Sequence, residues 1–418
     1  MLPFYKIATT LISPLIPLWL RYRTSKGKED PTRIGERFGH TSHMRPKGTL
    51  LWIHASSVGE SNSVLALIRQ LTSRFPKLSI LLTTGTVTSA NLMGKQLPKG
   101  VVHHYAPIDT PDATERFIAH WYPDVVWFVE SEFWPNLIDA AKRYFCLMAV
   151  VNARMSERSF VMWKKYPNVT RAMFSAFRFF FTQSTRDANR LRELGAAEII
   201  ESGNIKYDAP PLSCNESELM KLHSAASDRK IFLAASTHSG EEILIAQTHA
   251  KLAKQFPNLL TIIVPRHANR GDEIASELSA FGVIHQRSKQ QAITPQTNIY
   301  IADTMGELGL FYRLANIVFM GGSLVAHGGQ NPLEPARLSC AIITGPHIHN
   351  FAEIYDEMKT SQAAIIVENA QMLFDESAKL FEQFALLDAL QTRAKLFVSK
   401  KGGASDMIIN LFASVFEQ

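Results

Sequence analysis

The chain has 418 residues, of which 46% are hydrophobic, 20% are charged and 10% are aromatic. This composition excludes a disordered protein, and the length predicts two or three domains with separate cores. Three widely separated cysteines, Cys146, Cys214 and Cys340, exclude a disulfide scaffold and are interpreted as small buried thiols in a reducing compartment. The formal net charge is +6, so the position of that charge indicates the kind of partner.

Residues 1–22 form an apolar segment with no charged residue from Ile7 to Leu20. A helix over that stretch rises about 21 Å, less than the ~30 Å hydrocarbon core of a bilayer. Counting from Met1, a span becomes marginally long enough, although three prolines make it irregular. We expect an N-terminal anchor helix. The sequence leaves open whether it spans the membrane, lies in the interface or packs on the protein.

Residues 23–48 form a basic collar behind this segment. Between residues 21 and 47 there are eight basic and three acidic side chains, and 8 − 3 = +5 is most of the net charge. An apolar segment followed by a basic one favours an anchor at the cytoplasmic, inner leaflet of a membrane with anionic lipids. Little aromatic interleaving and no recognition motif argue against nucleic-acid binding.

Two series of short apolar runs then alternate with amphipathic stretches, as in βαβ units with buried parallel strands. The first series includes Leu50–Ala55, Leu78–Thr84, Asp124–Glu130, Cys146–Val151 and Arg178–Thr182. The second includes Ile231–Ala235, Leu259–Val264, Asn298–Ala302, Asn316–Met320, Ala341–Thr344 and Ala363–Val367. We therefore expect an α/β protein with two Rossmann-like doubly wound domains, residues 49–206 and 229–418, joined by a linker over 207–228 and facing each other across a cleft.

Polar motifs follow the predicted strands of the first series, where ligands bind in such folds. Glu60 of SSVGE falls in the first turn of a helix, and its alternative role is to complement the helix dipole. Glu130 and Glu132 of ESEFWPN follow a buried strand and must be paired, used or helix-capping. Lys206 of GNIKYD places a cation near the domain junction, or is a solvated linker lysine.

The second series carries motifs suited to an anion. STHSGEE over 236–242 offers hydroxyls and backbone N–H groups at a helix start, and Arg266 with His267 could grip a phosphate. The glycines at 321–322 and 328–329 would let a phosphate approach the backbone, and Glu334 could accept hydrogen bonds from a ribose. The sequence contains no GxGxxG fingerprint and no P-loop.

Together these motifs resemble the Kdo transferases of lipopolysaccharide synthesis, which add 3-deoxy-D-manno-octulosonic acid (Kdo) to the lipid A precursor. The similarity runs from GERFG at 35–39 through SSVGE, ESEFWPN, GNIKYD, STHSGEE, PRH, DTMGEL, MGGSL and GGQNPLEPA to TGPH at 344–347. The resemblance implies the GT-B fold and CMP-Kdo as the donor. It also implies inverting transfer to the tetraacylated precursor, lipid IVA.

The resemblance also implies roles for single residues. Glu60 would be the general base, and Glu130 and Lys206 would stabilise the transition state. The implied CMP-binding residues are Arg266, His267, Met305, Gly306, Glu307, Asn331, Pro332, Leu333 and Glu334. The chain departs from the family pattern at Gln330, where histidine is frequent. No metal site and no cofactor are expected.

Two other classes of protein stay open at this stage. One is another GT-B enzyme of the envelope, such as a heptosyltransferase or a UDP-sugar transferase. The other is a non-catalytic lipid-binding membrane protein built on a transferase fold. No short motif encodes the number of Kdo residues transferred or the oligomeric state.

Overall fold

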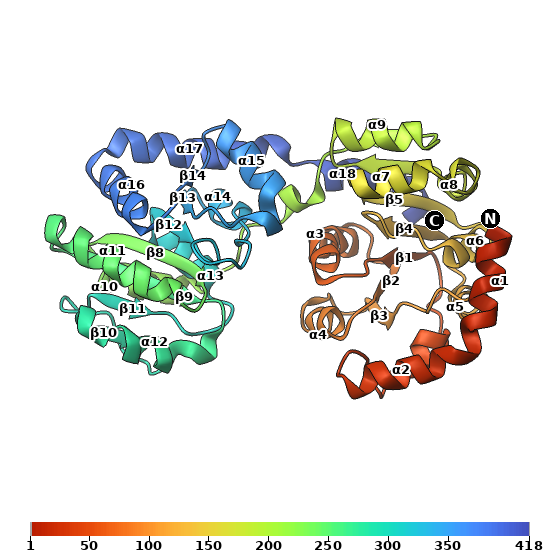
Figure 1. Cartoon of the computed structure of the whole chain (residues 1–418), viewed down its shortest axis with the longest axis horizontal. Helices are drawn as coiled ribbons and strands as arrows, with labels where there is room; N and C mark the ends of the chain where they lie inside the picture. The colour runs from red at the N-terminus through yellow and green to blue at the C-terminus, as the bar shows by residue number, and fades with distance from the viewer. Residues whose placement is uncertain (1, 418) are drawn as a thin grey trace. The chain divides into compact units, whose positions relative to one another are not determined.

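The computed structural model describes residues 2–417 and divides into two compact α/β units (Figure 1). The first unit contains the chain up to Ala209 together with the segment from Lys401 onward, and the second contains Pro210–Lys400. Each unit is built on a seven-stranded sheet whose paired strands are all parallel. The predicted α/β architecture with two parallel-sheet domains is confirmed.

The first sheet has the strand order β3-β2-β1-β4-β5-β6-β7. Its strands are β1 (Leu50–His54), β2 (Ser79–Thr84), β3 (Val102–Tyr105), β4 (Val125–Val129), β5 (Leu147–Ala153), β6 (Phe179–Thr182) and β7 (Ile199–Glu201). The helices of this unit that follow the N-terminal segment are α3 (Val58–Arg74), α4 (Val87–Gln96), α5 (Pro111–Trp121), α6 (Pro135–Arg143), α7 (Glu157–Lys164), α8 (Pro167–Phe174), α9 (Thr185–Glu193) and α18 (Ala404–Phe416).

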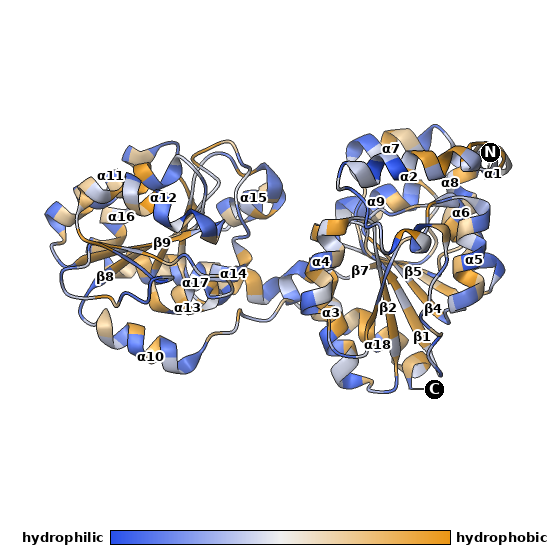
Figure 2. Ribbon diagram, turned by 90° about the horizontal axis from the view of Figure 1, so that it is seen from below, coloured by the Kyte–Doolittle hydropathy of each residue, from blue (hydrophilic) through white to orange (hydrophobic). Residues whose placement is uncertain are grey.

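Central strands of this sheet are apolar on both faces, which is why they read as continuous apolar runs. Leu50 and Trp52 of β1 belong to one core cluster, whereas Leu51 and Ile53 belong to a second cluster on the opposite face. Figure 2 shows hydrophobic residues concentrated on these strands and hydrophilic ones on the outer sides of the helices.

The second sheet has the order β10-β11-β9-β8-β12-β13-β14. Its strands are β8 (Lys230–Thr237), β9 (Leu259–Pro265), β10 (Ile284–Gln286), β11 (Ile299–Ile301), β12 (Ile317–Met320), β13 (Ala341–Thr344) and β14 (Ile365–Ile366). Its helices are α10 (Glu216–Ala225), α11 (Glu241–Gln255), α12 (Gly271–Glu277), α13 (Leu308–Leu314), α14 (Leu333–Arg337), α15 (Ala352–Thr360), α16 (Ala370–Glu382) and α17 (Phe384–Lys401).

The predicted domain boundaries differ from the observed ones in two places. The expected linker over 207–228 contains helix α10, and residues 401–417 belong to the first unit rather than the second. Helix α18 returns to the first sheet because Phe412 and Phe416 pack on Trp127 of β4, with ring centroids 5.2 and 5.8 Å apart. An amphipathic pattern predicts a helix, but it does not say which core the helix covers.

The N-terminal segment is not one anchor helix. It forms α1 (Leu2–Ile12), a 3₁₀ turn η1 (Ser13–Leu15) and α2 (Ile16–Ser25), with Pro14 and Pro17 in the first turns of η1 and α2. Proline fits a first turn, where its missing N–H costs nothing, but it interrupts a continuous helix. Within residues 2–417 we find no helix long and apolar enough to cross a membrane.

Polar side chains attach α1 to the first unit. The Tyr5 hydroxyl donates to Asp109 Oδ2 at 2.9 Å, and Asn136 Nδ2 donates to Thr9 Oγ1 at 3.0 Å. Most of the larger apolar side chains of the segment are exposed, among them Phe4 (76%) and Leu11 (74%), whereas Leu20 is buried. This distribution is the reverse of that expected for a helix packed on a soluble protein.

Four of the eight basic side chains between residues 21 and 47 form ion pairs within the first unit. Arg23 and Arg37 both contact Glu29, Arg33 pairs with Glu36, and Arg45 pairs with Asp124. The remaining basic side chains, Arg21, Lys26, Lys28 and Lys47, are exposed.

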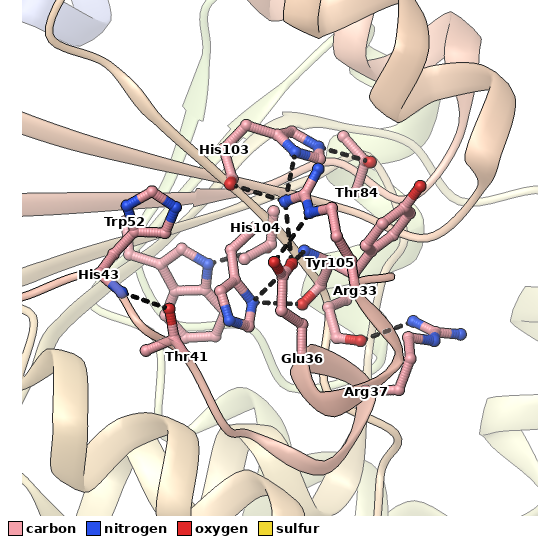
Figure 3. A network of polar contacts seen from close by, with 12 residues as sticks. Arg33, Glu36, Arg37, Thr41, His43, Trp52, Thr84, His103, His104 and Tyr105 are labelled. Atoms are coloured by element: carbon pink, nitrogen blue, oxygen red, sulfur yellow. Dashed lines mark hydrogen bonds and ion pairs between the residues drawn. The ribbon is translucent and has the colours of Figure 1, made fainter. Parts of the chain in front are cut away.

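A buried polar network fastens the GERFG segment to edge strand β3 (Figure 3). Arg33 donates to both carboxylate oxygens of Glu36 at 2.8 and 2.9 Å and to the His103 carbonyl at 2.9 Å. Glu36 in turn accepts from the Tyr105 backbone N–H at 2.7 Å. Burial, followed by the charge of Arg33, lowers the pKa of His103 to about 4. The segment that follows the N-terminal helices is therefore held rigidly against the sheet.

Candidate functional site

Glu60 lies in the first turn of α3, directly after β1, as the sequence predicts. Its Oε2 accepts from the Ser56 backbone N–H at 2.8 Å, and its Oε1 accepts from the Ser57 hydroxyl at 2.8 Å. Glu60 lies in the first turn, next to the N-cap Ser57, so its position also allows the alternative role of complementing the helix dipole. Burial raises the pKa of Glu60, and so do the negative charges of Glu132 and Glu130. The hydrogen bonds from Ser57 and Ser56 lower the pKa, but by less, so it is raised overall. A carboxylate in this state is a stronger base than an exposed glutamate.

Glu130 and Lys206 meet in the first unit. Lys206 Nζ lies 3.0 Å from Glu130 Oε1, and both side chains are partly buried. Glu130 follows β4 with φ +58°, a left-handed conformation that glutamate rarely adopts. Such strain is retained where surrounding contacts demand it, often at functional sites.

The GNIKYD segment is positioned from both sides, which holds Lys206 in place. The buried amide oxygen of Asn152 in β5 accepts from the Ile205 backbone N–H at 3.1 Å. The Asp208 carboxylate accepts from the backbone N–H groups of Gly403 and Ser405, both at 2.6 Å, and so caps helix α18. The C-terminal helix thus helps to place the predicted lysine, a link that the sequence does not reveal.

Glu132, which the sequence analysis expected to be paired, used or helix-capping, joins this cluster together with His54, to which it assigned no role. Trp134 Nε1 donates to Glu132 Oε2 at 2.7 Å, and His54 Nε2 lies 3.7 Å from the same oxygen. Burial by itself would raise the pKa of Glu132, but the interactions with His54, Trp134 and Ser56 lower it overall. The signal that could have indicated His54 is a polar residue at the end of the buried strand LLWIH.

In the second unit, Glu241 occupies the backbone groups that the sequence offered to an anion. Its Oε2 accepts from the N–H groups of His238 (3.0 Å) and Gly322 (2.6 Å), and its Oε1 accepts from those of Ser323 and Leu324, both at 2.9 Å. The amides of His238 and of residues 322–324 are therefore not free to bind a phosphate, and an anion site at STHSGEE stays a prediction for its other groups. The fully buried carboxylate instead fixes the loop after β12 against the start of α11.

Basic side chains from several strand ends gather around His238. The rings of His238 and His327 stack with centroids 4.1 Å apart, and His267 lies edge-on to His238 at 6.0 Å. Burial and then the neighbouring His327, His267 and Arg266 lower the pKa of His238 to about 4. Gln330 Nε2 lies 3.2 Å from His238 Nε2, so the residue that departs from the family pattern contacts this cluster. Arg266 and His267 are exposed, and the cluster can attract an anion.

The residues at 305–307 that were predicted to bind the nucleotide differ in whether they are free to contact a ligand. The Glu307 carboxylate accepts two hydrogen bonds of 2.6 Å from Arg287, which hold this side chain within the unit. Residues 305–307 can therefore contact a ligand mainly through their backbone. Gly306 has φ +83°, and nothing lies within 4 Å of the position where its Cβ would stand, whereas Met305 is exposed. These features leave the loop after β11 open to a ligand.

The NPLE residues lie at the start of α14. Asn331 Nδ2 donates to Glu334 Oε1 at 3.2 Å, and the side chains of Pro332 and Leu333 are buried. Burial raises the pKa of Glu334, partly offset by Asn331, Arg337 and Arg266. Glu334 is thus close enough to sense the charge of Arg266. Within residues 2–417, no three His, Cys, Asp or Glu side chains are grouped so that they could hold a metal ion.

Comparison with known proteins gives consistent matches. The family model described as 3-Deoxy-D-manno-octulosonic-acid transferase (kdotransferase) matches residues 32–209. The chain is 38% identical to a probable 3-deoxy-D-manno-octulosonic acid transferase, mitochondrial, of Arabidopsis thaliana, over 87% of this chain and 84% of the relative. It is 35% identical to the 3-deoxy-D-manno-octulosonic acid transferase of Rickettsia bellii, over 90% of each chain.

Among solved structures, UDP-GlcNAc 2-epimerase from Neisseria meningitidis bound to UDP-GlcNAc has a similar fold. The TM-score is 0.60 at 13% identity, with 88% of this chain and 100% of the epimerase covered. At this identity the similarity concerns the fold of two parallel-sheet units and not the chemistry.

Proposed function

The chain belongs to the 3-deoxy-D-manno-octulosonic acid transferase family and is a glycosyltransferase of lipopolysaccharide synthesis; we propose that it moves Kdo from CMP-Kdo to the lipid A precursor, lipid IVA. The observation that carries the mechanism is the partly buried Glu60 carboxylate at the end of β1, held by Ser56 and Ser57 beside Glu130 and Glu132. A chain with this cluster and this family membership has the parts that an inverting sugar transfer needs.

We propose that Glu60 is the general base. A sugar hydroxyl is a weak nucleophile at neutral pH, and a base that takes its proton during attack accelerates the reaction by roughly 10²–10⁴-fold. The raised pKa of Glu60 suits this role, because a more basic carboxylate holds the transferred proton more firmly. Direct displacement of CMP then needs one base and forms no covalent intermediate.

Lys206 and Glu130 are proposed to stabilise the transition state. The ion pair holds the ammonium group at a defined place, 3.0 Å from the carboxylate, instead of on a mobile side chain. A cation positioned in advance costs no reorganisation when negative charge develops on the departing phosphate. Because the pair is partly buried, solvent screens it less than a surface pair.

CMP is proposed to bind in the second unit. Arg266 and His267 would contact the phosphate, the backbone of Met305, Gly306 and Glu307 would approach the nucleotide, and Asn331 through Glu334 would contact the ribose. The exposed basic groups after β9 and the open loop after β11 support this assignment. Transfer requires the donor bound there to meet Glu60 of the first unit.

We also propose that α1 and α2 lie in the interface of the inner membrane on its cytoplasmic face. Their polar side chains bind the first unit, and their apolar side chains, including Phe4, Leu11 and Leu18, are exposed. A surface of this kind enters the boundary between headgroups and acyl chains, and the exposed lysines next to it attract anionic lipids.

The function is tested by mass spectrometry of lipid IVA after incubation with the enzyme and CMP-Kdo. We expect Kdo to be added from CMP-Kdo and not from UDP- or ADP-sugars, and the mass gives the number of residues transferred. Glu60→Gln should lose at least 100-fold in turnover while CMP binding survives. Near-normal turnover by this variant would remove Glu60 as the base.

The membrane assignment is tested by flotation with anionic vesicles. The double variant Phe4→Ser, Leu11→Ser should float far less than the unaltered protein. Met407→Ser, Leu411→Ser is the matched control, because it removes two exposed apolar side chains from α18 instead. Equal loss in both double variants would contradict a specific role for α1.

A further inference from the structure

His54 is a buried histidine that the proposed function does not use. It ends β1, is 1% exposed, and places its ring between the sheet and the loop that follows β4. Its Nδ1 lies 2.9 Å from the Thr83 hydroxyl of β2. Its Nε2 is buried without a hydrogen-bond partner among residues 2–417, and Glu132 Oε2 lies 3.7 Å away. A buried polar atom aimed at a carboxylate needs an explanation.

The Thr83 hydroxyl lies between Trp52 and His54. Trp52 Nε1 can only donate, and it does so to Thr83 Oγ1 at 2.9 Å. Thr83 Oγ1 also lies 2.9 Å from His54 Nδ1 and 3.5 Å from the Ile53 carbonyl, to which its hydroxyl can donate. These contacts hold the His54 ring so that Nε2 faces Glu132.

Glu132 and Glu60 are brought together by Ser56. The Ser56 backbone N–H donates to Glu60 Oε2 at 2.8 Å, and the Ser56 side chain is close enough to Glu132 to lower the pKa of that carboxyl. The Gly85 backbone N–H donates to the Ser56 carbonyl at 2.8 Å, and a Cβ at Gly85 would stand 2.8 Å from the Ser56 hydroxyl. Residues that follow β1, β2 and β4 therefore surround Ser56, which contacts both carboxylates.

We propose that the His54–Glu132 pair is a positioning device for the base: His54 keeps Glu132 ionised beside Glu60, and that second negative charge makes Glu60 more basic. The inference rests on the proposed role of Glu60. Two like charges at short range oppose each other's ionisation, and the site with the better hydrogen-bond donors keeps its charge. Glu132 accepts from Trp134 Nε1 at 2.7 Å and faces His54 Nε2 at 3.7 Å, and these contacts together with Ser56 lower its pKa, so it is the partner that stays ionised.

The other charged groups near the His54–Glu132 pair do not change which glutamate stays ionised. Besides Glu132, Glu130 is the negative charge from the β4–α6 loop that acts on Glu60. Glu130 faces Lys206 of η3 (Ile205–Asp208) and is partly neutralised by it. Asp109, which precedes α5, also senses His54. Glu132 is therefore the main negative charge that acts on Glu60.

The pH dependence of kcat/KM tests this proposal. Glu60 must be ionised to accept a proton, so activity falls on the acid side as pH drops through the value at which Glu60 protonates. In Glu132→Gln we expect this acid limb to move about one pH unit toward lower pH, with a lower plateau because the base is weaker. His54→Gln should move the limb in the same direction by a smaller amount.

Two control variants distinguish tuning from a purely structural role. Glu132→Asp keeps the charge and should keep the limb closer to that of the unaltered enzyme than Glu132→Gln does. Glu198→Gln removes an exposed glutamate of the same unit and should leave the profile unchanged. A Glu132→Gln enzyme with a reduced rate but an unmoved acid limb would overturn the proposal. If Glu60→Gln is itself active, the base assignment fails instead, so the two failures are distinguishable.

Discussion

The Glu241 carboxylate organises a loop of the second unit, and its replacement by glutamine changes one atom in a site with four defined contacts. Each carboxylate oxygen accepts two backbone N–H groups, from His238 and Gly322 on one side and from Ser323 and Leu324 on the other. Glutamine retains one oxygen and turns the other into an NH₂ group, which cannot accept. Two of the four buried N–H groups therefore lose their partner.

The cost follows from those two groups. Leaving a buried donor unsatisfied costs about 1–3 kcal/mol, so Glu241→Gln should lower the free energy of unfolding by about 4 kcal/mol. Because the loop after β12 also contacts the His238 cluster through Gly322, we expect CMP affinity to fall by at least tenfold. Denaturant unfolding of the full-length protein and calorimetric titration with CMP measure the two effects.

The matched control is Glu277→Gln, which removes an exposed glutamate from α12 of the same unit. It should change neither stability nor CMP affinity. If Glu241→Gln unfolds at the same denaturant concentration as the unaltered protein and binds CMP equally well, the four contacts do not organise the loop, and the reasoning fails.

Three further predictions concern single residues. Burial and then Arg229 lower the pKa of His249 to about 4, so His249 is neutral when folded; about 3 kcal/mol of stability should be lost as pH falls from about 6.5 to 4, and His249→Gln should flatten this loss in urea unfolding at several pH values. An equally steep profile in the variant would contradict this assignment. Phe412→Ala should destabilise the first unit by about 3–5 kcal/mol, because Phe412 packs on Trp127 across the returning helix; a change below 1 kcal/mol would show that α18 is dispensable. Lys206→Met should reduce kcat by at least 100-fold with CMP affinity retained, as measured by turnover and calorimetry, and unchanged turnover would remove the lysine from the reaction.

The central strands were predictable because burial on both faces demands continuous apolar runs. The strands that the sequence analysis missed are β3, β7 and β10, and each lies at the edge of its sheet. Edge strands are only partly buried and carry polar side chains, such as His103 and His104 in β3. Their assignment depends on a neighbouring strand that the local sequence does not specify.

Residue types alone also suggested the wrong use of some groups. The amides near Gly322 looked available to a phosphate, but Glu241, more than eighty residues away, satisfies them. The resemblance implies that Glu307 contacts CMP; its carboxylate is held by Arg287, and a contact through its backbone stays a prediction. A hydrogen bond between distant segments is a property of the fold, and no spacing rule reports it.

The sequence by itself determined the α/β class, the two series of parallel strands and the motifs that identify the family, because apolar runs and strand-end residues are local features. Only the tertiary structure decided that α18 returns to the first sheet, that the N-terminal helices bind the protein through polar side chains, and that Ser56 links Glu60 to Glu132. The physical reason is the same in each case. These contacts join residues far apart in the chain, and their energies depend on burial and distance, which exist only once the chain has folded.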